Sequence, residues 1–99
     1  MKRFTTRVML HFADEQEDYT QLHTEMEKHG FTRTIISDED NKEYKLPTAE
    51  YNYIGESTRS EVLNKAKIAA KATNHKYAIL VTPTLGRTWI GLEEVKKVN

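Results

Sequence analysis

The sequence predicts one α+β domain in which two helices cover one face of an antiparallel sheet. Three observations carry this prediction: apolar residues alternate in several segments, two other segments carry apolar residues at helical spacing, and the two kinds follow one another in a defined order. At 99 residues the chain has room for one domain with one core. A two-domain enzyme with a buried cofactor is therefore excluded.

The first predicted strand extends from Phe4 to Phe12. Its core-facing side carries Phe4, Thr6, Val8, Leu10 and Phe12. A helix is then expected from Asp14 to about His29, because a carboxylate cap precedes apolar residues at helical spacing. Gly30 favours the left-handed conformation that ends many helices, and Phe31 can fold back onto the last turn.

A second strand is predicted from Phe31 to Ser37, where β-branched residues precede a polar turn. Tyr44 and Leu46 are expected to form a ragged hairpin arm before the third strand. In that strand Tyr51 and Tyr53 alternate with polar residues, which is typical of a buried face. The alternative is that Tyr44, Tyr51 and Tyr53 form an aromatic surface that stacks on RNA bases.

The clearest helix begins at Thr58, which forms a capping box with Glu61. Its predicted apolar stripe carries Val62, Leu63, Ala66, Ala69, Ala70 and Thr73. The dense apolar run from Tyr77 to Val81 predicts a fourth strand in a central position. Glycines interrupt both periodicities in residues 83–99, so this segment is expected to form a fifth strand or a C-terminal arm.

The resulting order is β-α-β-β-α-β, the split βαβ arrangement of the ferredoxin-like plan. Residues 1–99 are expected to form this single domain, with both helices on one face of the sheet. The opposite face is left open for function or for a partner.

Composition narrows the function. Lysine plus arginine and aspartate plus glutamate both total 15, so no global field attracts nucleic acid. The chain has no cysteine, no membrane-length apolar run and no signature of a common cofactor site. We expect a cytoplasmic protein without a small-molecule cofactor or a metal site, although the sequence leaves a divalent metal open.

His11 and Asp14 are the candidate catalytic residues, because a strand-end histidine beside a carboxylate can transfer a proton near neutral pH. Arg7 lies on the same side of the strand as His11 and could bind a phosphate. The alternative is a solvated sheet face or the surface of a homodimer. Arg33 and Arg59 add candidate RNA contacts near the hairpin and at the start of the second helix, where a solvated surface is again the alternative.

Trp89 and Ile90 form a second candidate site, an apolar pair in the C-terminal arm. Large apolar side chains outside the predicted core are typical of protein interfaces. The sequence therefore also allows a protein partner that binds the arm.

Four segments together resemble the GhoS endoribonuclease antitoxins of type V toxin–antitoxin pairs: residues 4–6, residues 19–22, residues 31–39 and residues 46–51. The helix start at residues 58–62 and the strand at residues 77–81 keep the order of that family. The resemblance covers roughly residues 4–82 and implies a Cas2-like ferredoxin fold. It also implies an RNA-cleaving antitoxin that acts on the messenger RNA of a small membrane toxin.

One position departs from the Cas2-like pattern, because His11 and Phe12 stand where those proteins place an aspartate at the end of the first strand. Asp14 follows only later, which argues against metal-dependent cleavage through that aspartate. The alternative function is a non-catalytic regulator or inhibitor, carried by a mobile element, that binds a protein through the open sheet face and the arm.

Overall fold

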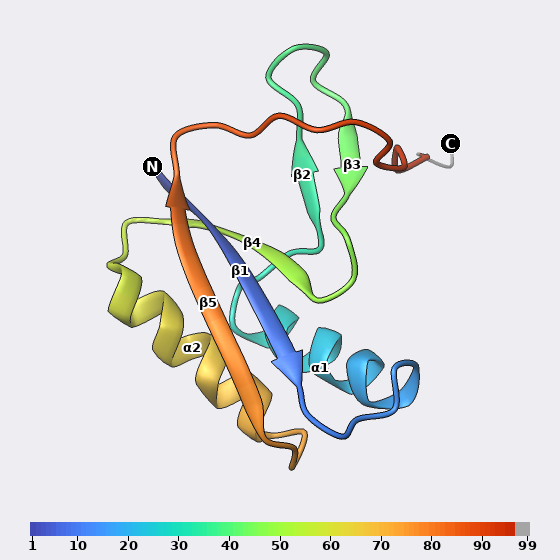
Figure 1. Cartoon of the computed structure of the whole chain (residues 1–99). Helices are drawn as coiled ribbons and strands as arrows, with labels where there is room; N and C mark the ends of the chain where they lie inside the picture. Colours follow the sequence, from blue (N-terminus) through green and yellow to red (C-terminus); the bar gives the residue numbers. More distant parts are fainter. Residues whose placement is uncertain (97–99) are drawn as a thin grey trace.

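The structure, a computed structural model, describes residues 1–96 of the chain (Figure 1). The elements are β1 (Lys2–Leu10), α1 (Glu17–Lys28), β2 (Thr34–Ile36), β3 (Glu43–Lys45), β4 (Glu50–Gly55), α2 (Arg59–Lys71) and β5 (Tyr77–Thr84). The predicted α+β class with two helices on an antiparallel sheet is confirmed. The order contains one short strand more than the predicted β-α-β-β-α-β, since the expected hairpin arm forms β3.

The main sheet has the order β4-β1-β5, and both neighbours of β1 are antiparallel to it. Both helices lie on the same side of this sheet (Figure 1). A backbone bridge between Thr32 and Asn52 continues the sheet beyond β4 for one residue pair. This arrangement is compatible with the ferredoxin-like plan, in which the strand after the first helix lies at that edge.

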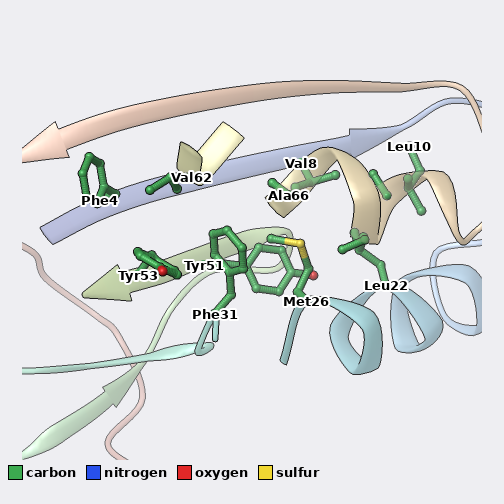
Figure 2. Packing of buried hydrophobic residues seen from close by; sticks show 12 residues of the cluster. Phe4, Val8, Leu10, Leu22, Met26, Phe31, Tyr51, Tyr53, Val62 and Ala66 are labelled. Carbon is green, nitrogen blue, oxygen red and sulfur yellow. The ribbon is translucent and has the colours of Figure 1, made fainter. Parts of the chain in front are cut away.

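The core lies between the sheet and the helices, as Figure 2 shows. The alternation in β1 correctly predicts that Phe4, Thr6, Val8 and Leu10 are buried. The centre of the core is aromatic. Tyr51 and Tyr53 are buried, and their ring centroids lie 6.4 and 5.1 Å from that of Phe31. Core packing, the first of the two interpretations of these tyrosines, is therefore confirmed.

The helix ends follow the predicted capping chemistry. Thr58 and Glu61 form the full capping box of α2, in which each side chain accepts a backbone N–H from the other residue. After α1, Gly30 adopts a φ of 89°, which favours glycine, and the N–H of Phe31 donates to the carbonyl of Met26. Within residues 1–96, neither helix combines the length and the apolar composition needed to cross a membrane.

The hairpin β2–β3 forms a second, two-stranded sheet, and residues 85–96 pass across it (Figure 1). We call residues 85–96 the arm. The arm pairs with β3 through the N–H of Lys45, which donates to the carbonyl of Glu93 at 2.8 Å, and the N–H of Val95, which donates to the carbonyl of Glu43. Ion pairs of Lys42 with Glu94 and of Lys45 with Glu93 accompany this pairing.

Several predictions about single elements are wrong. β5 lies at an edge of the sheet rather than at its centre, and alternate side chains on it are exposed, among them Leu80 at 65%. Phe12 is fully exposed, because the chain leaves the sheet after Leu10 and turns with a φ of 56° at Phe12. Leu63 is also exposed rather than part of the buried stripe.

The predicted segment 83–99 divides into two parts. Pro83 and Thr84 belong to the end of β5, and the following residues form an arm rather than a fifth strand of the main sheet. Residues 97–99 of that prediction lie outside the described part of the chain.

Candidate functional site

The end of β1 holds His11 in a defined position. The N–H of His11 donates to the carbonyl of Lys76 at 2.8 Å. The carbonyl of His11 lies 3.2 Å from Nδ1 of His75, which donates to it. The segment before β5 thus fixes the backbone of His11 on both sides, while its side chain stays exposed to solvent.

His75 is fixed in turn by Asp18, the second residue of α1. Its Nε2 lies 3.0 Å from Oδ2 of Asp18, and both side chains are half-buried. The same carboxylate oxygen accepts the N–H of Asp14 at 2.7 Å. Sequence reasoning missed this Asp18–His75 pair, because no periodic pattern links a residue of α1 to a residue of the distant segment before β5.

Asp14 caps the start of α1. Its Oδ1 accepts the backbone N–H groups of Glu17 at 2.8 Å and of Gln16 at 2.9 Å. These hydrogen bonds, that of Glu17 first, hold the pKa of the Asp14 carboxyl below its ordinary value. Asp14 is therefore a fixed negative charge three residues after His11 rather than a proton donor near neutral pH.

The open face of the main sheet leads away from His11. The odd-numbered residues of β1 point to this face: Arg3, Thr5, Arg7 and Met9. Arg7 is exposed and stands opposite Glu50 on β4, so a carboxylate lies beside it on the same face. Of the three predicted RNA-binding arginines, only Arg7 lies on β1, the strand that leads directly to His11.

The other two predicted arginines lie elsewhere. Arg33 precedes β2 and lines a hollow between the hairpin and the arm, together with Glu27 and Lys45. Arg59 is the first residue of α2, in the helix layer beyond the end of β4. The predicted RNA contacts therefore do not form a single cluster.

The opposite end of the open face carries a second polar cluster, which sequence reasoning also missed. Arg87, from the arm, reaches back over the sheet and donates from Nε to Oγ1 of Thr5 at 3.0 Å and from Nη2 to Oδ1 of Asn52 at 2.6 Å. Burial and the nearby Arg3 lower the pKa of Arg87 below its ordinary value. No period in the sequence could reveal this contact, because the arm has none.

The predicted partner interface splits into two environments. Trp89 packs on Tyr44 of β3 with 5.5 Å between ring centroids, so part of its surface is already covered within the chain. Ile90 is 97% exposed. The predicted pair therefore combines a partly covered tryptophan with an isoleucine that is open to solvent.

Residues 1–96 contain no group of three or more histidine, aspartate or glutamate side chains arranged to hold a metal ion. Comparison of the chain with protein-family models, with curated proteins and with solved structures finds no match.

Proposed function

We propose that the protein binds single-stranded RNA on the open face of its sheet and cleaves it with His11 as the general base. One observation supports this proposal above the others: an exposed histidine with a doubly anchored backbone directly follows β1, the strand that presents Arg7. A rigid backbone with a free imidazole suits a group that must meet a substrate proton in a fixed geometry.

The proposed cleavage needs only three side chains, those of His11, Asp14 and Arg7. The imidazole of His11 accepts the proton of a ribose 2′-hydroxyl as that oxygen attacks the adjacent phosphorus. The bond from phosphorus to the 5′ oxygen breaks, water protonates the departing oxygen, and a 2′,3′-cyclic phosphate remains. The Asp14 carboxylate favours the imidazolium that forms, and Arg7 offsets charge on the phosphate.

The biological setting comes from the resemblance. A GhoS-like protein with a ferredoxin-like fold would act in the cytoplasm as the antitoxin of a type V pair, on the messenger RNA of a small membrane toxin. The extra strand β3 and the pairing of the arm with it would be additions to that plan.

The direct test incubates purified protein with a pool of structured and unstructured RNAs, with and without magnesium. His11→Ala should abolish cleavage and leave the far-ultraviolet circular dichroism spectrum unchanged. Asp14→Asn should reduce the rate while retaining helix-capping hydrogen bonds, because an amide oxygen still accepts them. Asp18→Asn tests the anchoring through His75 and should lower the rate less than His11→Ala does.

His29→Gln is the matched control. His29 lies at the carboxyl end of α1, about 18 Å along the helix from the amino end that follows Asp14. The variant should cleave as the wild type does. Cleavage that persists in a folded His11→Ala variant would remove His11 from the mechanism.

A protein-binding regulator is the second candidate, and one observation favours it. Three apolar side chains stand exposed on the open face: Met9, Ile54 and Leu80. Binding to protein should respond weakly to added salt, whereas binding to RNA should weaken steeply. The salt dependence of the isolated complex therefore separates the two functions.

A further inference from the structure

The guanidinium of Arg87 is held by neutral oxygens. Thr5 and Asn52 stand opposite each other on β1 and β4, and their side chains accept two of its N–H groups. Within residues 1–96, no carboxylate lies at ion-pair distance from Arg87. A half-buried cation held in this way is oriented but not neutralised, and its remaining N–H groups can bind an anion.

Arg3 adds a second cation beside Arg87. Both arginines line one cleft of about 410 Å³ between the sheet end, the hairpin tip and the arm. Arg3 contacts Asp38 at 3.4 Å, and that carboxylate is 77% exposed. Such a long and exposed ion pair is weak, so a phosphate can replace it.

The wall of the same cleft is aromatic. Tyr44 and Trp89 both line it, with their rings tilted by 60°. Asp40 accepts the hydroxyl hydrogen of Tyr44 at 2.7 Å, which fixes this ring. Arginines beside a fixed aromatic pair are the elements with which single-stranded RNA is bound, through phosphate contacts and base stacking.

We infer that this cleft binds one nucleotide of a single-stranded RNA, with its phosphate on Arg87 and Arg3 and its base against Trp89. The inference rests on the proposed function for the nature of the ligand and adds a second contact point to it. Arg3 and Met9 lie on the same strand face about 20 Å apart. An RNA strand bound in the cleft can therefore follow the open face past Arg7 toward His11.

The tip of the hairpin sets a limit on this ligand. Asp38, Glu39 and Asp40 also line the cleft, and Asp38 contacts Arg3. Hydrogen bonds from the backbone N–H of Lys42 and from Tyr44 keep the pKa of Asp40 below its ordinary value. These carboxylates repel phosphate, so the phosphate must bind chiefly to Arg87, with which no carboxylate of residues 1–96 pairs, and must replace Asp38 at Arg3. Only the base can approach the hairpin tip.

Trp89 is the only tryptophan of the chain, so its fluorescence reports directly on this cleft. The probes are inorganic phosphate, adenosine 5′-monophosphate and a single-stranded RNA of roughly eight nucleotides, a length typical of single-strand sites. The His11→Ala protein prevents cleavage during the titration. The RNA should quench Trp89 most strongly, the mononucleotide less, and inorganic phosphate little.

Variants are compared by the anisotropy of a fluorescein-labelled RNA of the same sequence. Arg87→Met should weaken binding about tenfold, and Trp89→Leu by about fivefold or more. Asp38→Asn should strengthen it a few-fold, because it frees Arg3 and removes a repelling charge. Lys28→Met is the control, a lysine in the helix layer that pairs with Glu25, and it should bind as the parent does.

Unchanged Trp89 fluorescence with RNA, or unchanged affinity in Arg87→Met, would overturn the inference. Equal quenching by inorganic phosphate and by the mononucleotide would also overturn it, since the base would then make no contact. Cleavage by the wild type, lost in His11→Ala, would still support the proposed function in each of these cases. If the protein neither bound RNA in the cleft nor cleaved it, the inference and the proposed function would both be rejected.

Discussion

Two regions of the molecule are stabilised in different ways. The body, residues 2–31 and 50–84, contains the whole apolar cluster between sheet and helices. The lobe, residues 33–49 and 85–96, buries Ile35 and Ser37 and otherwise depends on backbone pairing, exposed ion pairs and the packing of Trp89 on Tyr44. Apolar burial stabilises far more than exposed ion pairs do, so the lobe should open locally while the body stays folded.

The largest effect should come from the aromatic centre of the body. Phe31→Ala removes a ring that is 1% exposed and packs on Tyr51 and Tyr53. It should lower the free energy of unfolding by about 3–5 kcal/mol. Urea denaturation followed by circular dichroism measures this loss.

Ile36→Ala is the matched change in the lobe, where the side chain is exposed. It should cost no more than about 0.5 kcal/mol. Equal losses in the two variants would mean that the body and the lobe share one core, contrary to the comparison.

A second prediction uses acid to weaken the body selectively. Burial, with Arg33 nearby, lowers the pKa of His23 from 6.5 to about 4. The neutral ring pairs through Nδ1 with the Tyr51 hydroxyl at 2.6 Å. Between these two pKa values the unfolded chain binds a proton that the folded chain does not, so stability falls as the pH is lowered through this window.

The expected loss between pH 7.5 and 4.5 is about 1–2 kcal/mol, reduced from the full shift because the ring is partly exposed. Urea unfolding at both pH values measures it. His23→Gln should flatten this dependence, whereas His29→Gln should keep it. A flat profile in the wild type would show that His23 is protonated without cost in the folded chain.

The body was easier to predict from the sequence than the lobe. The body was predictable because its contacts follow short periods: alternation in β1 gives Phe4 and Val8, and helical spacing gives Leu22 and Met26. The capping box at Thr58 is equally local. The place of β5 was mispredicted, because a dense apolar run is common to central strands and to edge strands that expose apolar residues.

The candidate sites were predictable only in part. His11, Asp14 and Arg7 became candidates because strand alternation and capping are local signals. The partners that define their surroundings come from distant segments: His75 on His11, Arg87 on Asn52, Trp89 on Tyr44. Such contacts depend on how turns and the arm direct the chain, and no spacing in one sequence encodes that direction.

A third prediction tests a local feature of the body. Thr58→Ala removes the hydroxyl that accepts the N–H of Glu61 at 3.1 Å at the start of α2. It should destabilise the protein by about 1 kcal/mol. Ser60→Ala, an exposed change in the same turn, should stay within about 0.5 kcal/mol of the wild type. Thermal unfolding of both variants at equal concentration ranks them, and an equal loss in each would remove the capping role from Thr58.

The smallest global effect should follow the largest deletion. A chain that ends at Thr84 lacks the arm, so the N–H of Lys45 loses the carbonyl of Glu93 and Tyr44 loses Trp89. Thr5 and Asn52 of the body also lose the hydrogen bonds from Arg87. Because the core of the body keeps every one of its residues, the midpoint of urea unfolding should shift by less than about 1 kcal/mol in stability. Hydrogen exchange resolved by residue should show rapid exchange at Lys45 and unchanged protection at the buried Val62, whose N–H donates to the carbonyl of Thr58 within the body. If Val62 lost its protection as well, the arm would be part of the cooperative unit, and the division into body and lobe would be wrong.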